Sequence, residues 1–292
     1  MSLPLITPLR TRGRAPRVLT IDAEDWFHVC GDGYYSDPRR WDGFASRIET
    51  TLMELFDRLA RGGHRATVFF LGWIARRRPA LVKEARRRGH EVGVHGDLHV
   101  RADEMAPSEF REDLRQACRS IEAAGGGDAF SVYRAAEWSI RDPGAAALPE
   151  LASAGFRCDA SMMPVPPLGS DAIPKGPHRI ERDGWSIVEL PPLTGRVLGQ
   201  RLPMGGAWPF RVLPSGRLAR AEARARDRGA PAVFTLHPWE LDSEHPRMDG
   251  LPAMLRAVHF AGLRGFPGRF ERWLEGDRCV AIGDVLPELV PA

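Results

Sequence analysis

Residues 17–28 read Arg-Val-Leu-Thr-Ile-Asp-Ala-Glu-Asp-Trp-Phe-His. The part from Val18 to Ile21 is a short apolar run with β-branched side chains, which predicts a buried strand. Three carboxylates follow within four positions, at Asp22, Glu24 and Asp25. Carboxylates between a core strand and two aromatic residues are costly unless they are paired or bind a metal ion. The stretch therefore predicts a buried strand that ends in a functional acidic cluster.

Two histidines lie four positions apart in the stretch Val-His-Gly-Asp-Leu-His-Val of residues 94–100. His95 and His99 can reach one metal ion if the backbone between them forms a helical turn or a tight loop. Neutral imidazole suits zinc, cobalt, nickel or iron, and two such ligands leave room for a carboxylate and a water. Histidines at this spacing also occur as ordinary surface or core residues. The acidic cluster upstream favours the metal site, because one carboxylate would complete the ligand set.

Two further strand-like runs end in polar side chains. Residues 232–236 are followed by His237, and an acid stands three residues later. A histidine in this position can donate a proton near neutral pH. Residues 131–133 are followed by Arg134, whose guanidinium can hold a carboxylate ionised through bidentate hydrogen bonds. The structural alternatives are a capped strand end for His237 and an ordinary ion pair for Arg134.

All four motifs place functional side chains directly after a short apolar strand. In barrels of repeated βα units, the C-terminal ends of the strands carry the chemistry. The remaining sequence alternates between helix and strand patterns, which favours a mostly parallel sheet or barrel. We predict a buried strand over 66–71, helices that end near residues 62, 89 and 125, and loops over 162–178 and 204–210.

In these four ordered motifs, from about Val18 to Glu240, the chain resembles the polysaccharide deacetylases of carbohydrate esterase family 4. Its first motif is most similar to a subgroup with the pattern Asp-x-Glu-Asp-Trp/Tyr, which is associated with exopolysaccharide biosynthesis. The resemblance implies an α/β fold, a distorted (β/α) barrel with about seven parallel strands. It also implies metal-dependent hydrolysis of N-acetyl groups on amino sugars.

The resemblance further implies a role for each motif residue. Asp22 matches the catalytic base of the family, and Arg134 matches the arginine that orients this base. His95 and His99 match the two metal-binding histidines, and His237 matches the catalytic acid. We therefore expect one divalent ion per chain, with zinc as the expected metal and cobalt, nickel or manganese as alternatives.

The chain departs from the family pattern at three places. The two adjacent aspartates of the usual first motif are separated here by Ala23. Because alternate strand positions share a face, Glu24 is the expected third ligand, and Asp25 stays open as an alternative. Ala136 stands where the family has a proline, which frees the local backbone. Thr235 replaces a leucine, so that we expect a different lining for the acetyl pocket.

Length and composition agree with one enzyme domain. The chain has 292 residues and 43% hydrophobic content, a size that α/β barrels fill as one unit. We expect a single catalytic domain over 1–292, with the motifs in 18–240 and a C-terminal extension over 241–292. The net charge of +3 creates no strong field. The arginine clusters 76–78 and 86–88 lack interleaved aromatic residues, which favours solvated helix faces over nucleic-acid binding.

The N-terminal sequence and the cysteines bear on the compartment. Residues 1–10 lack a charged segment followed by an apolar one, and no later stretch is long enough to span a bilayer. The four cysteines are scattered without a Cys-x-x-Cys pair, which is typical of free thiols in a reducing compartment. These features predict a cytoplasmic protein without a membrane span, and they leave its oligomeric state open.

The expected activity is removal of an N-acetyl group from an amino sugar of a polysaccharide, an oligosaccharide or a glycan precursor. Trp26, Trp138, Trp208 and Trp239 lie in or near the motif loops, where their faces can stack on sugar rings. One alternative is hydrolysis of another C–N bond, in a small cyclic amide or ureide or in an N-formyl sugar. The other alternative is a carbohydrate-binding barrel without catalytic activity.

Overall fold

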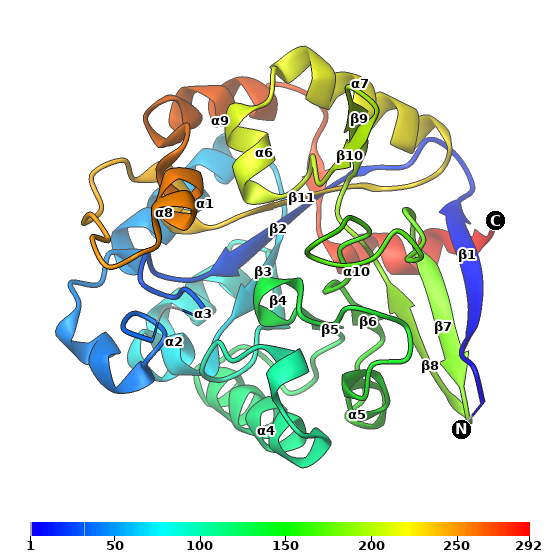
Figure 1. Cartoon of the computed structure of the whole chain (residues 1–292), viewed down its shortest axis with the longest axis horizontal. Coiled ribbons are helices and arrows are strands. Elements are labelled where there is room, and N and C mark those ends of the chain that lie inside the picture. The colour runs from blue at the N-terminus through cyan, green and yellow to red at the C-terminus, as the bar shows by residue number, and fades with distance from the viewer. Residues whose placement is uncertain (1, 32) are drawn as a thin grey trace.

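One large curled sheet forms the centre of the computed structural model, which describes residues 2–31 and 33–292. Figure 1 shows the helices arranged around its strands. In the described residues, seven neighbouring strands run parallel, in this order: β11 (Ala232–Leu236), β2 (Arg17–Ala23), β3 (Thr67–Phe70), β4 (Glu91–Val94), β5 (Val132–Tyr133), β6 (Cys158–Asp159) and β8 (Trp185–Glu189). The predicted distorted barrel with about seven parallel strands is thus confirmed.

Antiparallel strands extend the sheet beyond β8. The order continues through β7 (His178–Arg182), β1 (Leu5–Thr11) and β13 (Leu289–Pro291). A short strand, β12 (Cys279–Val280), pairs in parallel with the start of β2. A separate hairpin is formed by β9 (Gly195–Val197) and β10 (Gln200–Leu202). The result is a curled mixed sheet rather than a closed parallel barrel.

Helices connect the parallel strands and cover the sheet. They are α1 (Ile48–Arg61), α2 (Gly72–Arg77), α3 (Pro79–Arg87), α4 (Pro107–Ala123), α5 (Ala147–Ser153), α6 (Ala207–Val212), α7 (Ser215–Asp227), α8 (Ala253–Phe260), α9 (Phe266–Leu274) and α10 (Ile282–Val285). Short 3-10 helices lie at Pro38–Gly43, Ala102–Glu104, Ala136–Trp138, Pro238–Leu241, Leu263–Gly265 and Leu286–Glu288.

The apolar pattern explains the central elements. All seven residues of β2 are buried, because a parallel strand in an α/β sheet is covered on both faces. Helix α1 buries the side chains that recur every three or four positions, including Leu52, Leu55 and Leu59. The predicted helices that correspond to α1, α3 and α4 and the predicted strand that corresponds to β3 are confirmed.

The predicted loop over 204–210 is wrong in its second half, where α6 begins at Ala207. Pro209 lies in the first turn of this helix, where a missing backbone N–H costs little. Phe210 is buried, and its ring contacts the rings of Phe234 and Phe266. A six-residue helix is marginal alone, so tertiary packing stabilises this one, and local sequence could not reveal it.

The C-terminal segment is built into the sheet and the core. Strand β12 pairs with Arg17 and Val18, and β13 pairs with β1. Phe266 and Phe270 of α9 belong to the same buried cluster as Leu19 of β2. The segment 241–292, which we expected as an extension, therefore contributes to the same core as the motif strands.

The cysteines and helices agree with two expectations. Cys30, Cys118, Cys158 and Cys279 are all free thiols. In the described part of the chain, no helix has both the length and the apolar character needed to cross a membrane.

Candidate metal centre

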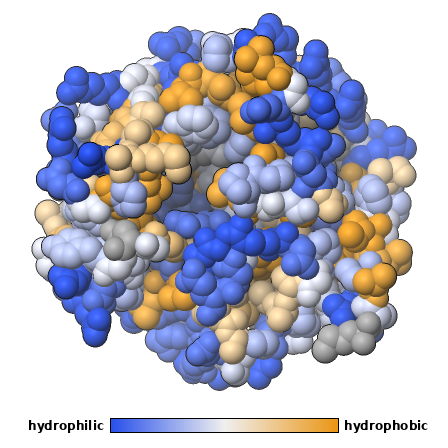
Figure 2. Space-filling model, viewed as in Figure 1, coloured by the Kyte–Doolittle hydropathy of each residue, from blue (hydrophilic) through white to orange (hydrophobic). Residues whose placement is uncertain are grey.

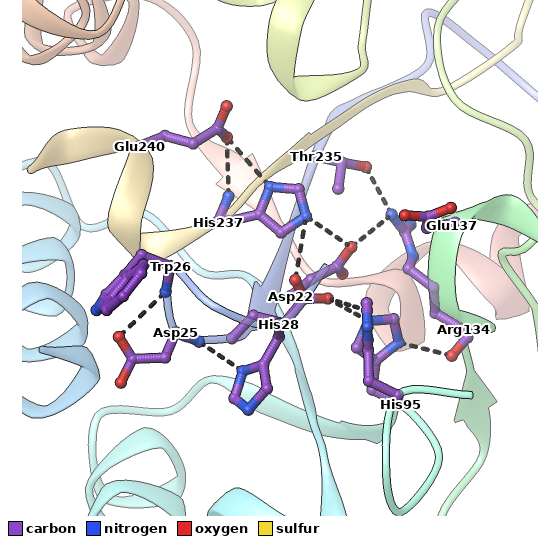
Figure 3. A network of polar contacts seen from close by, with 12 residues as sticks. Asp22, Asp25, Trp26, His28, His95, Arg134, Glu137, Thr235, His237 and Glu240 are labelled. Atoms are coloured by element: carbon purple, nitrogen blue, oxygen red, sulfur yellow. Dashed lines mark hydrogen bonds and ion pairs between the residues drawn. The ribbon is translucent and has the colours of Figure 1, made fainter. Parts of the chain in front are cut away.

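The four motifs meet at one edge of the sheet. Residue pairing places Ile21 of β2 beside Leu236 of β11, and Phe70 of β3 beside Val94 of β4. The strands are parallel, so their C-terminal ends lie together, and the side chains that follow them converge (Figure 3). Figure 2 shows this face of the molecule hollowed near its middle. The sequence predicts this arrangement, because each motif directly follows a strand.

Glu24, His95 and His99 form a buried cluster. One carboxylate oxygen of Glu24, Oε1, lies 2.7 Å from Nε2 of His95 and 2.9 Å from Nε2 of His99. The three ligand atoms all lie within 4.8 Å of one another. Burial raises the pKa of Glu24, but the charges and hydrogen bonds of the histidines outweigh it and hold the pKa well below its ordinary value. Glu24 is therefore an ionised carboxylate between two imidazoles.

The ring of His95 has a defined tautomer. Its Nδ1 lies 2.7 Å from the backbone carbonyl oxygen of Arg134, which can only accept a hydrogen bond. Nδ1 therefore donates, and in the neutral ring Nε2 presents a lone pair toward the carboxylate of Glu24. Nε2 lies within hydrogen-bond distance of Oε1 of Glu24, at 2.7 Å, and the two atoms are close enough to bind one cation. A carboxylate oxygen with two imidazole nitrogens, one held by a carbonyl, is a donor set that fits zinc and similar divalent ions.

The loop that carries both histidines is fixed by α2. The backbone N–H groups of Gly72 and Trp73 donate to the carbonyls of Gly96 and Asp97, at 2.9 and 3.1 Å. A Cβ atom at Gly72 would lie 2.1 Å from Oδ1 of Asp97 and 2.9 Å from the backbone of Ala117, so this position requires glycine. Nη2 of Arg76 donates to Oδ2 of Asp97 at 3.0 Å. These contacts hold the loop in one shape, which keeps both imidazoles directed at Glu24.

Arg76 shows a limit of the sequence-based interpretation. We expected the cluster 76–78 to be a solvated helix face, and Arg77 does pair with the exposed Asp42. Arg76 is exposed too, but its guanidinium also pairs with Asp97, between the two histidines of the motif. The only sequence signal for this role is the acid within the His-x-x-x-His stretch, which does not identify its partner.

Asp25 lies outside the metal cluster. Its carboxylate accepts hydrogen bonds from the backbone N–H groups of Arg47, at 3.0 Å, and Ile48, at 3.3 Å, where α1 begins. The N–H of Trp26 also donates to it, at 3.1 Å. Asp25 thus satisfies free amides at a helix start, and it does not approach His95. Of the two candidates for the third ligand, the structure brings only Glu24 to the histidines.

Asp22 lies beside the cluster, and Arg134 supports it. Nη1 of Arg134 is 3.6 Å from Oδ2 of Asp22, so the contact is an ion pair rather than the expected bidentate hydrogen bonds. The same nitrogen donates to the hydroxyl of Thr235 at 2.7 Å, and this hydroxyl lies 2.9 Å from that of Thr20. Thr235, which replaces the family's leucine, therefore helps to hold Arg134. Oδ1 of Asp22 is buried without a hydrogen-bond partner.

The backbone after Arg134 takes an unusual path. Glu137 and Trp138 both have left-handed backbone angles, with φ of 51° and 57°, which cost energy for residues other than glycine. This turn follows Ala136, where the family has its proline. It places the ring of Trp138 4.5 Å from the guanidinium carbon of Arg134, while Phe69 lies 4.9 Å away. The strained turn thus completes the packing around the buried arginine.

His237 faces the cluster from β11. Its Nε2 lies 3.8 Å from Oδ2 of Asp22 and 3.8 Å from Oε2 of Glu24. Its other ring nitrogen lies 3.4 Å from Oε2 of Glu240, which also accepts the backbone N–H of His237 at 2.9 Å. Burial lowers the pKa of His237, but the charges of Glu24 and Glu240 outweigh it and raise the pKa to about 9. His237 therefore carries a proton at neutral pH.

A buried arginine completes this arrangement. Nη1 of Arg211 lies 2.7 Å from Oε1 of Glu240, and both side chains are buried. Arg211 is the ion-pair partner of Glu240, and Glu240 orients the ring of His237. Arg211 belongs to α6, the helix that begins within the stretch 204–210 that we predicted as a loop. Sequence reasoning had no signal for it.

The tryptophans divide into two pairs. Trp26 and Trp239 are buried, and Trp239 stacks on His259 with ring centroids 4.3 Å apart. They belong to the core, and the prediction that they stack on sugar rings is wrong. Trp138 and Trp208 are half-buried and keep exposed surface. Only these two remain as candidates for contact with a sugar.

Two family models match adjacent parts of the chain. The polysaccharide deacetylase model matches residues 40–157, and a domain of unknown function, DUF3473, matches residues 160–286. The first part contains the histidine pair and Arg134, and the second contains His237 and Arg211. The acidic motif precedes both. The centre therefore combines residues from both parts.

The fold is similar to that of several solved structures. A proposed polysaccharide deacetylase from Mycobacterium smegmatis matches with a TM-score of 0.56 at 19% identity, over 92% of this chain and 94% of that one. A carbohydrate esterase family 4 pseudoenzyme from Bacillus anthracis matches with a TM-score of 0.51 at 13% identity, over 95% and 67% of the two chains. A mutant of that pseudoenzyme with restored activity matches with a TM-score of 0.51 at 14% identity, over 95% and 69%. These likenesses support the fold.

Proposed function

We propose that this protein is a metal-dependent hydrolase that removes N-acetyl groups from amino sugars of a polysaccharide, an oligosaccharide or a glycan precursor. The observation that carries the proposal is the buried set of Glu24, His95 and His99, with Asp22 and His237 beside it. The polysaccharide deacetylase match over 40–157 supports the substrate class. The first motif's resemblance supports a role in exopolysaccharide biosynthesis.

Glu24, His95 and His99 would hold one divalent ion, and their oxygen and nitrogen donors favour zinc. When bound, the ion supplies Lewis-acid polarisation of the acyl carbonyl and lowers the pKa of a water. The contact of His95 Nδ1 with the carbonyl of Arg134 orients the ring so that Nε2 is directed at Glu24. The braced loop between the histidines presents both rings without rearrangement.

Asp22 is suited to act as the general base. Its Oδ1 is buried and has no hydrogen-bond partner, so it is free to accept a proton from the attacking water. Arg134, 3.6 Å from Oδ2, is the ion-pair partner that orients this carboxylate. Thr235 and the two aromatic rings keep the guanidinium in place. General base assistance of this kind contributes about 10²–10⁴-fold in rate.

His237 is suited to act as the general acid. Cleavage of an amide needs a proton on the departing nitrogen, and His237 is protonated because its surroundings raise its pKa to about 9. Its Nε2 faces Asp22 and Glu24, while Glu240 holds the opposite side of the ring. The base and the acid thus flank the same point from two strands.

A test of the acid compares two substrates in the His237→Ala variant. An N-acetylated amino sugar should be hydrolysed about 10²–10⁴-fold more slowly, while an activated acetyl ester, whose leaving group needs no proton, should be affected much less. Equal losses on both substrates would show that His237 binds the metal or the substrate instead. Metal content should be unchanged in this variant.

The activity itself is tested by acetate release. The protein should be stripped of metal, reloaded with zinc, cobalt, nickel or manganese, and supplied with a panel of N-acetylated sugars and lipid- or nucleotide-linked precursors. Acetate that appears only after reloading supports the proposal. Release of formate, or turnover of cyclic amides alone, would favour another C–N hydrolase. Sugar binding without any turnover would favour a binding protein.

A further inference from the structure

A second cavity lies in the part of the chain that matches the domain of unknown function. It has a volume of about 570 Å³ and is bounded by α7, by the β9–β10 hairpin and by the chain just before β7. In Figure 2, hydrophilic side chains border the upper right of the molecule, where Figure 1 shows α7 and this hairpin. The cavity is separate from the metal centre, whose residues do not line it.

One wall of the cavity is a row of arginines. Arg217, Arg220, Arg224 and Arg228 follow at intervals of three, four and four residues, which places them on one face of α7 and its end. The opposite face of α7 is buried and includes Leu218. The row extends over twelve residues, or about 16 Å along a helix. It is longer than a single small anion can bridge.

The facing wall adds more positive charge. It carries Lys175, Arg196 and Arg201, and apolar side chains such as Leu193 and Met204 lie between the two walls. Within residues 2–31 and 33–292, the cavity lining contains no Asp or Glu. Arg201 pairs with Asp171, which lies outside the lining. For the other six cations, the described residues provide no ion pair.

The contrast with the buried face of the same helix is informative. Arg226 on that face shares Glu222 with Arg17, at 2.9 and 2.8 Å. The whole chain has a net charge of only +3, so the excess of positive charge is local to the cavity. A concave surface with charges of one sign concentrates ions of the other sign. The geometry therefore fits an extended ligand with several negative charges.

We propose that this cavity binds an anionic polysaccharide, whose carboxylates pair with the arginines of α7. The proposal rests on the proposed function in that the same glycan would carry the acetylated sugar. Two backbone hydrogen bonds connect the cavity to β11, the strand that precedes His237. The N–H of Leu193 donates to the carbonyl of Val233, and the N–H of Thr235 donates to the carbonyl of Gly205. About 20 Å of extended strand separates Pro231, in the lining, from His237. Strand β11 thus runs from the cavity lining to the metal centre.

Two other polyanions fit the cavity less well. Single-stranded nucleic acids bind grooves in which aromatic side chains stack on bases, and the lining residues include no aromatic ring in the described structure. A flat anionic membrane surface would contact a convex or planar basic face, while these cations surround a concavity. A sugar chain with carboxylates matches both the charge and the shape.

The test measures binding of hexagalacturonate to the full chain by calorimetry, with neutral maltohexaose as the comparison. The variant Arg217→Gln, Arg220→Gln, Arg224→Gln removes three charges from the cavity. Its matched control, Arg115→Gln, Arg119→Gln, Arg272→Gln, removes three charges from α4 and α9. Three lost pairings at an exposed surface should weaken binding about tenfold to thirtyfold. Circular dichroism checks that both variants are folded.

The expected result is tight binding of the uronate, loss of affinity in the cavity variant and at high salt, and no change in the control variant. Equal affinity for maltohexaose, or an equal loss in the control variant, would overturn the proposal. Binding of phosphatidylglycerol vesicles or of a single-stranded oligonucleotide, without binding of the uronate, would overturn it too. Acetate release from a neutral N-acetylated oligosaccharide reports separately on the proposed deacetylase activity of the unmodified protein.

Discussion

The metal centre and the cavity beside α7 differ in whether their charged side chains have partners of opposite charge. At the centre, Glu24, Arg134 and Glu240 are buried, and each lies against a group of complementary charge or hydrogen-bonding character. In the cavity, the cations on α7 face one another without an acid among the described lining residues. Buried charges must be paired or hydrogen-bonded within the fold, whereas charges in contact with solvent can remain unpaired until a ligand binds. The first region therefore has the paired charges that suit the proposed hydrolysis, and the second has the unpaired charges that suit the proposed ligand.

The largest effect is expected when two of the proposed metal ligands are removed. In the variant His95→Ala, His99→Ala, metal and activity should be lost together, with a rate loss of at least about a thousandfold, because two of three ligands are gone. Metal analysis and acetate release measure the two effects, and circular dichroism checks the fold. Stoichiometric metal in this double variant would show that the ion binds elsewhere.

The acids of the first motif should separate into three behaviours. Asp22→Asn should keep the metal and lose about 10²–10⁴-fold in rate, because only the base is removed. Glu24→Gln should weaken metal affinity markedly. Asp25→Asn should keep the metal and lower the free energy of unfolding by about 1 kcal/mol, because it weakens the start of α1. Metal titration and urea unfolding distinguish them, and stronger metal loss for Asp25 than for Glu24 would reverse the assignment.

The contrast between the two regions can be tested by comparing how two arginine substitutions change the free energy of unfolding. Arg211→Gln leaves the buried Glu240 with only His237 as a cationic neighbour and should lower the free energy of unfolding by about 3 kcal/mol. Arg224→Gln removes one of several like charges in the cavity and should change the free energy of unfolding by no more than about 0.5 kcal/mol. Urea unfolding at neutral pH measures both. Equal costs would mean that the cavity arginines have structural partners after all.

A smaller effect concerns the pH dependence of the acid. The pKa of His237 is raised, to about 9, so the protonated acid is present at lower pH and is lost as the pH rises through that value. Activity should therefore fall on the alkaline side. Glu240→Gln removes one of the charges that raise this pKa, and the alkaline limb should move down by about one pH unit. An unmoved limb in this variant would assign it to another group.

Much of the site could be predicted because of how parallel strands are arranged. Asp22, His95, Arg134 and His237 each follow an apolar run, and the C-terminal ends of parallel strands meet at one edge. A short pattern after each strand is therefore enough to predict that residues far apart in the sequence lie close together in space. The same local patterns predicted α1, α3 and α4, whose apolar side chains recur at helical spacing.

Other features were decided only by the tertiary structure. Arg76 and Arg211 reach Asp97 and Glu240 across the fold, and α6 forms because Phe210 has a place in the core. The choice between Glu24 and Asp25 depended on where α1 begins, since its free amides take up Asp25.

The sequence by itself therefore determined the central motif strands and the candidate residues at their ends, because apolar runs and the polar side chains that follow them are local patterns. The partners of those residues and the cavity of α7 depend on which distant surfaces pack together. That packing is set by the whole core and not by any single stretch.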